Sequence, residues 1–397
     1  MSQFDPSRRR AFKALGYAGA GLLSAPLFAD TRIRLPFENG ERELAAFPGK
    51  RPMIVLTQRP PQLETPFSVF NDGLITPNDA FFVRYHWSGL PLSVDPTAFR
   101  LQIHGQVERP LQLTLSELKS LGNPVELIAI NQCSGNSRGH FSPRVNGGQL
   151  HHGAMGNARW TGVPLKRVLD AAGVRAGAKQ VVFDGLDRPP LPNGPDFIKA
   201  LDVDHARDGE VMIAWSMNGE DLPLLNGYPL RLIVPGYYGT YWVKHLNDIE
   251  VIDKEFDGFW MSKAYRIAAP KGAPDATVPI NRMNVRSFLT SLIDGARIPM
   301  QQAVVLRGIA FDGGSGIAAV DVSTDGGQSW QAAELGRDTG RYGFQEWTFH
   351  FVPAERGTYR IQTRARNRRG DVQPRQQNWN AAGYMRNMIE TTTVLAT

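Results

Sequence analysis

The chain has 397 residues, a formal net charge of +6 and a hydrophobic content of 42%. That length suffices for two domains or one large one, and 40 glycines and 28 prolines favour a loop-rich, β-rich protein over a helical bundle. The positive charge is spread in short runs without a nucleic-acid-binding motif, which favours a mildly basic soluble protein over one that binds nucleic acid.

A single cysteine, Cys133, narrows the chemistry further. One thiol excludes an intrachain disulfide framework and a zinc site built from several thiolates. The residue is therefore an inert buried thiol, a nucleophile or a metal ligand.

Residues 1–29 have the features of a signal peptide. A basic run ending in Arg9-Arg10-Ala11-Phe12-Lys13 precedes an apolar stretch, residues 14–28, that is too short to span a bilayer comfortably. The paired arginines are similar to a twin-arginine signal, which exports folded proteins. We therefore expect a periplasmic protein without a stable membrane span; an uncleaved basic amphipathic helix is the alternative.

The remaining chain divides into three parts. Residues 30–75 are rich in proline and predict an extended N-terminal arm. Residues 76–270 mix short apolar runs with a few helical patterns, which predicts an α+β domain with a mixed sheet. Within this domain we expect helices over 115–118 and 164–169 and strands over 81–87, 181–183 and 230–236.

Residues 271–397 show a different pattern. Apolar and polar residues alternate over 304–310, 317–323 and 359–364, and Asp325-Gly326-Gly327 is typical of a hairpin turn. Short strands at this spacing predict a β-sandwich of about a hundred residues.

The candidate chemistry centres on Cys133. The apolar run Val125–Ile130 leads into a loop of small polar residues in which Gly135 allows close approach of a ligand. Arg138 follows five residues later and could lower the pKa of the thiol or bind an anion. These residues alone leave a catalytic or ligating thiol and a structural cysteine equally open.

Two other segments carry cations. Strand alternation places Arg84 and His86 on one face, which suits an anion or a phosphate, although a polar face toward water is the simpler interpretation. Glycine-rich turns beside Arg231 and Lys244 predict a phosphate cradle, but such turns are common and the signal is weak in isolation.

In chain order, these segments resemble the sulfite oxidase family of molybdenum enzymes. The matching motifs are Phe81-Phe82-x-Arg84-x-His86, Cys133-x-Gly135-Asn136-x-Arg138, residues 158–162, Met217-Asn218-Gly219, Gly227-x-Pro229-x-Arg231 and Val243-Lys244. Residues 316–330 resemble the C-terminal dimerisation domain of that family. The resemblance implies a mixed-sheet molybdopterin-binding domain in residues 76–270, followed by an immunoglobulin-like β-sandwich.

The resemblance also assigns roles. It implies that the Cys133 thiolate binds molybdenum, together with one pterin, and that Arg84, Arg138 and Tyr265 form the catalytic pocket. It implies that the pterin and its phosphate are held by His86, Asp187, Arg231 and Lys244. A soft thiolate suits a metal that accepts two electrons, and guanidinium groups suit a small oxyanion.

The function implied is oxidation of sulfite to sulfate by the molybdenum subunit of a bacterial periplasmic sulfite dehydrogenase. The chain has no Cys-x-x-Cys-His haem motif. We therefore expect an external c-type cytochrome to accept the electrons, with the chain in a homodimer or in a heterodimer with a cytochrome subunit.

Several positions depart from the animal enzymes and match the bacterial branch better. Asn226 replaces a phosphate-binding histidine, Leu150 replaces a pocket tryptophan, and residues 379–383 lack an arginine for which Arg386 is a candidate substitute. The alternatives are a molybdenum-dependent reductase of sulfoxides or of another small oxyanion, a hydrolase using Cys133 with His140, and a non-catalytic binding protein. The C-terminal sandwich argues against the shorter periplasmic methionine sulfoxide reductases.

Overall fold

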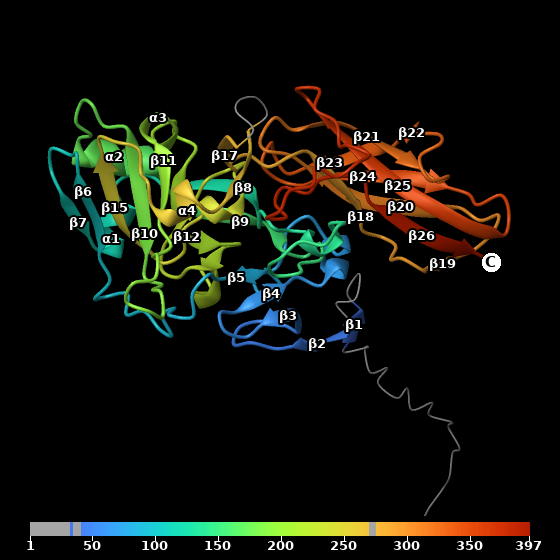
Figure 1. Cartoon of the computed structure of the whole chain (residues 1–397), viewed down its shortest axis with the longest axis horizontal. Coiled ribbons are helices and arrows are strands. Elements are labelled where there is room, and N and C mark those ends of the chain that lie inside the picture. Colours follow the sequence, from blue (N-terminus) through green and yellow to red (C-terminus); the bar gives the residue numbers. More distant parts are fainter. Residues whose placement is uncertain (1–31, 35–40, 270–274) are drawn as a thin grey trace, which may run out of the picture. The chain divides into compact units, whose positions relative to one another are not determined.

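The computed structural model describes residues 32–34, 41–269 and 275–397. The predicted signal peptide, with Arg9 and Arg10, lies outside the described residues. In the described part of the chain, strands predominate and the helices are short (Figure 1). None of these helices is both long enough and apolar enough to cross a bilayer.

The first sheet is built mainly from the segment predicted as an arm. Its order is β1 (Arg32–Arg34), β2 (Glu41–Ala45), β3 (Met53–Thr57), β4 (Gln62–Glu64) and β5 (Val83–Arg84). The backbone is extended as expected, but it is paired rather than free, and it leads into the 3-10 helix η2 (Phe67–Asn71). Because Gln62 pairs with Arg84, this segment supports the first candidate site strand.

The strand expected over 81–87 is only two residues long. Beyond Arg84, the antiparallel register with β4 would place Tyr85 and His86 opposite Pro61 and Pro60. Proline has no N–H with which to continue the ladder, so the chain leaves the sheet there. His86 therefore lies in a loop.

Two sheets form the central domain. One has the order β11 (Lys199–Asp202), β10 (Gln180–Gly185), β15 (Leu246–Ile252), β6 (Leu101–Gly105), β7 (Leu111–Leu113). The other has the order β13 (Glu220–Asp221), β12 (Met212–Met217), β9 (Met155–Pro164), β8 (Val125–Gln132), with β14 (Arg231–Ile233) also paired to β12. The pair β15–β6 is parallel whereas the other pairs are antiparallel, so the domain has the mixed sheet predicted.

The predicted helices are confirmed. α1 (Leu115–Ser120) begins with a capping box in which Thr114 and Glu117 bond each other's backbone N–H groups. α2 (Leu165–Ala172) buries Leu165, Val168 and Leu169 and ends at Gly173, whose φ of +74° favours glycine. The remaining helices are short: α3 (Val203–Ala206), α4 (Phe259–Ser262), η3 (Arg138–His140), η4 (Leu224–Asn226) and η5 (Gly239–Tyr241).

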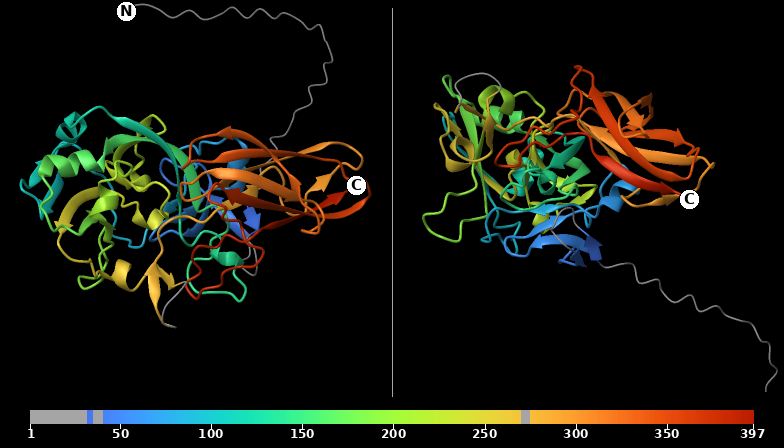
Figure 2. Two further views of the ribbon diagram at one scale, coloured as in Figure 1. Left: turned by 90° about the horizontal axis from the view of Figure 1, so that it is seen from above. Right: turned by 45° about the vertical axis from the view of Figure 1, so that its right-hand side comes forward.

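The C-terminal domain is the predicted β-sandwich, of immunoglobulin-like architecture (Figure 2). After the two-stranded β16 (Arg266–Ala268)–β17 (Thr277–Pro279), one sheet has the order β18 (Arg286–Leu289), β20 (Val304–Phe311), β24 (Gln345–Phe351), β23 (Glu334–Asp338). The other has the order β19 (Arg297–Ile298), β26 (Thr391–Ala396), β25 (Gly357–Asn367), β21 (Ile317–Ser323), β22 (Gln331–Ala332). The predicted turn at 325–327 joins β21 to β22, and Trp347 and Val320 belong to a separate core between the sheets.

Candidate functional site

A cavity in the central domain brings together most of the residues proposed from the sequence. Six of those eight residues line it: Arg84, His86, Cys133, Arg231, Lys244 and Tyr265. They come from five separate segments: the end of β5 with the loop after it, the end of β8, the strand β14, the loop after η5 and the loop after α4. Sequence neighbours do not build this cavity; the packing of the sheets does.

Cys133 is the first residue after the edge strand β8. Strand β8 pairs with β9 through Gln132 and Met155, and the Cys133 N–H then donates to the carbonyl of Ala154 at 2.9 Å. The side chain is only partly buried and faces the cavity. A thiol held on a fixed backbone at a cavity wall is available as a ligand, unlike an inert core cysteine.

Arg231 and Lys244 supply positive charge without an anionic partner. Arg231 is 4% exposed and donates to the carbonyl of Asn226 at 3.0 Å, while Lys244 Nζ donates to the carbonyl of Arg84 at 2.9 Å. Neither forms an ion pair with another described residue. Loss of water lowers the pKa of Arg231 to about 10 and that of Lys244 to about 7. An anionic ligand would offset this cost and keep both groups charged.

His86 and Tyr265 form a hydrogen-bonded pair at the cavity wall. His86 Nε2 contacts the Tyr265 hydroxyl, and the imidazole stacks on Phe197 with ring centroids 3.9 Å apart. Burial, followed by the charge of Arg84, holds the pKa of His86 well below its usual value. A neutral imidazole results, and burial likewise raises the pKa of Tyr265, so the phenol keeps its proton.

Arg138, which the resemblance assigns to the anion pocket, is not among the residues that line the cavity. Its guanidinium donates to the carbonyls of Ala382 and Gly148 at 3.1 and 3.3 Å. It lies 5.4 Å from the ring centroid of Tyr384, which in turn stacks on Tyr265. Arg138 is therefore linked to the lining residue Tyr265 through Tyr384, and its charge acts on Tyr265.

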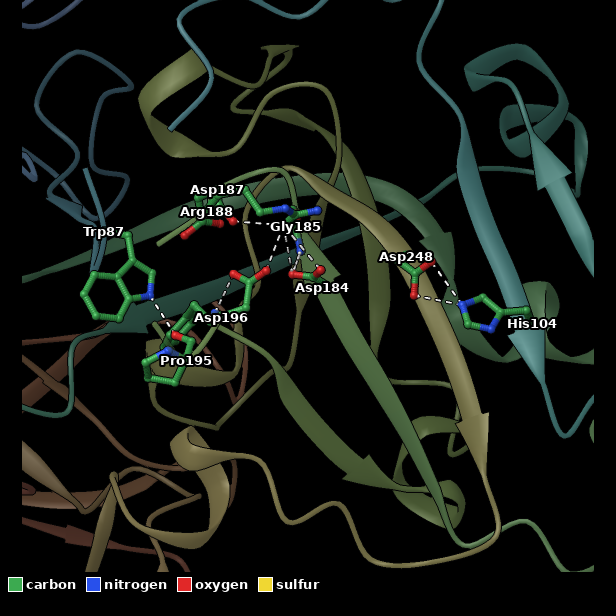
Figure 3. A network of polar contacts seen from close by, with 10 residues as sticks. Trp87, His104, Asp184, Gly185, Asp187, Arg188, Pro195, Asp196 and Asp248 are labelled. Carbon is green, nitrogen blue, oxygen red and sulfur yellow. Dashed lines mark hydrogen bonds and ion pairs between the residues drawn. The ribbon is translucent and has the colours of Figure 1, made fainter. Parts of the chain in front are cut away.

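Asp187 also lies behind the lining, in the network of Figure 3. Burial raises the pKa of its carboxyl, and the charge of Lys244 partly offsets that rise. Its neighbour Arg188 donates to the carbonyl of Asp187 at 2.9 Å and forms ion pairs with Asp184 and Asp196, each at 3.3 Å. Asp187 is thus placed to support Lys244 from behind.

Sequence reasoning missed several polar groups of the cavity. Besides Arg231, whose Nε lacks a partner, three lining residues have buried side-chain atoms without a hydrogen-bond partner among the described residues: Asn131, Ser134 and Thr240. Gly239, beside them, is needed because a Cβ there would lie 2.3 Å from Asn131 Oδ1. Buried polar groups are normally satisfied, so these atoms indicate a ligand that forms hydrogen bonds.

Lys50 was also missed. This lysine of the N-terminal sheet donates to Asn226 Oδ1 at 2.6 Å and to the carbonyl of Phe81 at 2.9 Å, while Asn226 Nδ2 donates to the carbonyl of Phe82. Lys50 therefore fixes the two lining segments relative to each other. Only its position between Gly49 and Arg51 is visible in the sequence, which gives no signal for a contact 176 residues away.

A second group of charged residues contacts the cysteine loop at Ser137. We call it the histidine–arginine cluster. Arg286 and Arg386 share the carboxylate of Glu390, and Arg286 donates to Ser137 Oγ at 2.7 Å. The cluster is completed by the imidazoles of His140, His151 and His152. Arg386, considered as a substitute cation for the anion pocket, belongs to this cluster and does not line the cavity. Leu150, at 2% exposure, belongs to the main core.

The three imidazoles are packed against one another rather than arranged around a point. The His140 and His152 rings are parallel within 8° at 4.2 Å, and His140 Nε2 lies 2.6 Å from His151 Nδ1. Parallel rings direct their in-plane lone pairs side by side, which does not suit a shared metal ion. His140 thus has a ring nitrogen paired with His151 and does not line the cavity, which weakens the hydrolase interpretation.

Comparisons with known proteins agree with the cavity chemistry. Residues 87–260 match the oxidoreductase molybdopterin binding domain, and residues 277–394 match the Mo-co oxidoreductase dimerisation domain. The chain is 35% identical to the sulfite oxidase of Gallus gallus over 78% of this chain and 70% of that protein. It is 33% identical to the mitochondrial sulfite oxidase of Mus musculus over 83% of this chain, but spans only 63% of that relative.

The fold has a counterpart among solved structures. The sulfane dehydrogenase SoxCD from Paracoccus pantotrophus superimposes with a TM-score of 0.73 at 25% identity, covering 95% of this chain and 93% of that one. A molybdopterin carries an anionic phosphate and many hydrogen-bonding atoms, which suit the cavity cations and the unpartnered polar atoms of Asn131, Ser134 and Thr240. The chain belongs to the sulfite oxidase family of molybdenum enzymes and uses a molybdopterin cofactor.

Proposed function

We propose that this protein oxidises sulfite to sulfate at a molybdenum–pterin centre held in the cavity around Cys133. The observation that carries the proposal is a partly buried thiol beside cations that form no ion pair with another described residue. The sulfite oxidases with which it shares about a third of its residues support the choice of substrate.

The residues present divide into two groups by role. Cys133 is the proposed ligand of molybdenum, because a soft thiolate stabilises a high-valent metal. Arg231 and Lys244, supported by Asp187, would hold the pterin phosphate, and Asn131 and Thr240 would bond its polar atoms. When bound, the centre supplies transfer of an oxygen atom and uptake of two electrons.

The substrate side is formed by Arg84, His86 and Tyr265. Arg84 is partly buried and would bind a sulfite oxygen by charge-assisted hydrogen bonds. Neutral His86 orients the Tyr265 hydroxyl, which would donate to a second oxygen. Arg138 would strengthen this attraction from behind Tyr384 rather than by direct contact.

The overall reaction needs an electron acceptor. Sulfite and water give sulfate, two protons and two electrons, and a c-type cytochrome would take the electrons one at a time. We place the enzyme in the periplasm, exported folded through the twin-arginine motif at Arg9-Arg10, with its C-terminal domain forming the dimer contact. Arg9 and Arg10 both changed to Lys should leave folded, cofactor-loaded protein in the cytoplasm, whereas an unchanged periplasmic yield would indicate another export route.

One experiment tests the substrate assignment. Protein purified from a molybdenum-replete host should contain molybdenum and reduce cytochrome c with sulfite. Arg84→Gln should raise the Michaelis constant for sulfite by roughly ten- to a hundredfold while the molybdenum content stays full, because one charge-assisted contact is lost. Unchanged sulfite kinetics would instead favour a neutral substrate, and a molybdenum-dependent sulfoxide reductase would become the better assignment.

A further inference from the structure

A buried lysine that none of the roles above uses lies behind the cavity wall. Lys199 begins strand β11 and is only 1% exposed, and it does not line the cavity. Its Nζ donates to the carbonyl of Trp260 in α4 at 2.7 Å. Among the described residues it makes no ion pair, which is rare for a lysine buried to this degree.

The ammonium group of Lys199 faces the aromatic residues that separate it from the substrate side of the cavity. It lies 5.3 Å from the ring centroid of Tyr265 and 4.6 Å from that of Tyr241. Tyr265 in turn contacts His86, and both line the cavity. The charge of Lys199 is therefore one aromatic ring away from the proposed position of the anion.

In the described part of the chain, no carboxylate forms an ion pair with Lys199, and the charge that acts on it is that of Arg266. The charged and titratable groups close to Lys199 include Arg266 in β16, Tyr241 in η5, and Tyr265 and His86 at the wall. The other elements packed against β11 carry Asp204 and His205 in α3 and Asp184 in β10. The partner of Lys199 across the sheet is Phe183 in β10, which carries no charge. An anion in the cavity would thus supply a negative charge that no ion pair among the described residues supplies to Lys199.

We propose that Lys199 is a positioning residue that sets the affinity of the cavity for oxyanions through its own protonation. The proposal rests on the cavity being the oxyanion site described above. When Lys199 is protonated, it holds the turn that carries Tyr265 and attracts the anion through the low-dielectric wall. When it is neutral, the attraction is lost while the hydrogen bond to Trp260 can remain.

The coupling works in both directions. Burial lowers the pKa of Lys199 to about 7, so a substantial fraction of the side chain is neutral at physiological pH. A bound anion favours the charged form and raises that pKa, so binding above neutral pH takes up a proton. Affinity must therefore fall as the pH rises through the pKa of the free protein.

Sulfate is the suitable probe, because it remains a dianion across this pH range whereas sulfite itself titrates. Calorimetric titration of the molybdenum-loaded protein with sulfate, in buffers of different ionisation enthalpy, measures affinity and proton uptake together. For the wild-type protein we expect proton uptake above neutral pH and affinity about tenfold weaker near pH 8.5 than near pH 6, the change expected for one pKa unit.

Two variants and a matched control separate charge from structure. Lys199→Arg should keep strong sulfate binding at high pH without proton uptake, and Lys199→Met should bind about tenfold more weakly near pH 6, also without uptake. Lys166→Met, an exposed lysine of α2 paired with Asp170, should behave as the wild type. If Lys199→Arg does not fold, the sulfate affinity and proton uptake of Lys199→Met test the proposal by themselves.

Proton uptake that persists in a folded Lys199 variant, or that is absent from the wild type, would overturn the inference. A purely structural lysine would change stability without changing proton uptake. The sulfate readout is independent of turnover. A protein that binds sulfate with proton uptake but fails to oxidise sulfite would refute the proposed function and keep this inference. Normal oxidation of sulfite without proton uptake on sulfate binding would keep the proposed function and refute this inference.

Discussion

Two groups of buried charge contact the cysteine loop, one at Cys133 and one at Ser137, and they differ in how the charge is compensated. In the cavity, Arg231 and Lys244 have only carbonyl acceptors for their hydrogen bonds. In the histidine–arginine cluster, Arg286 and Arg386 share the carboxylate of Glu390. Both groups lose water on folding, but among the described residues only the second has an ion pair with an anion of the protein; Asp187 acts on Lys244 without pairing with it.

This difference separates a ligand site from a structural contact. An uncompensated cation destabilises the fold, so its presence is best explained by an anion that arrives with a ligand. The cluster has an anion of its own and joins elements distant in the chain, here the loop at Ser137 and the strand β18, although Arg286 Nε and Nη1 and Arg386 Nε have no hydrogen-bond partner among the described residues. The comparison therefore predicts that variants in the cavity change function with little loss of stability. Variants in the cluster should lower stability with little change in function.

The largest effect is expected at Cys133. Cys133→Ser keeps the size of the side chain but replaces a soft thiolate by a harder oxygen that matches the metal poorly. Turnover of sulfite should be abolished, while the midpoint of urea unfolding of the cofactor-free protein stays at the wild-type value. A serine variant with near wild-type activity would rule out the thiolate role.

Glu390 should produce the largest effect on stability. Glu390→Gln removes the shared carboxylate and leaves Arg286 and Arg386 unpaired, which should lower the free energy of unfolding by about 3 kcal/mol. Lys244→Met is the matched contrast in the cavity, because it removes a cation with no ion-pair partner. It should reduce cofactor content without destabilising the cofactor-free protein, and equal destabilisation by both variants would refute the comparison.

The cluster should also make stability sensitive to acid. Burial lowers the pKa of His140 to about 3 and that of His151 to about 4, and it lowers the pKa of His152 as well. Below about pH 6.5 the unfolded chain takes up protons that these folded imidazoles do not, so stability falls as the pH falls from that value toward 4. Glu64 opposes this trend between about pH 4.5 and 7, because burial raises its pKa to about 7.

His152→Phe isolates one of these contributions. The ring is already packed between Phe67 and Phe288, so a phenyl group should fit. Denaturant unfolding between about pH 5 and 6 should show a dependence of stability on pH reduced by about 1.4 kcal/mol per pH unit, the value for one titrating group. An unchanged slope would mean that His152 already takes up a proton in the folded protein.

The fold and the site differ in how far sequence patterns could predict them. The helices at 115–120 and 165–172 and the sandwich strands were predictable because their signals are local: a capping box, apolar periodicity and a Gly-Gly turn. The strand at 81–87 was predicted too long, because what ends it is a pair of prolines, Pro60 and Pro61, in the turn before the neighbouring strand β4.

For the site, the motifs that resemble the family identified Cys133, Arg231 and Lys244. Residues whose role depends on distant partners gave no signal. Lys50 and Lys199 are ordinary lysines in the sequence, and their burial is set by segments that fold over them. Arg138 was assigned to the pocket by the family resemblance, and its hydrogen bonds to the carbonyls of Gly148 and Ala382 could not be predicted from the sequence.

The smallest expected effect is at Ser137, the residue that connects the two regions. It lies on the cysteine loop with a φ of 68°, and its hydroxyl accepts from Arg286 and lies 2.6 Å from His152 Nδ1. Arginine can only donate, so the hydroxyl must donate to His152. Ser137→Gly removes these two hydrogen bonds without strain, because glycine adopts a positive φ freely, whereas alanine would not.

We expect Ser137→Gly to lower the free energy of unfolding by about 1 kcal/mol, the usual contribution of a hydrogen bond. Molybdenum content and the Michaelis constant for sulfite should stay at wild-type values, because Cys133 is fixed independently by the pairing of β8 with β9 and by its N–H bond to Ala154. If molybdenum content instead fell in proportion to the loss of stability, the cluster would be positioning the ligand loop. The cavity and the cluster would then have to be treated as one cooperative unit.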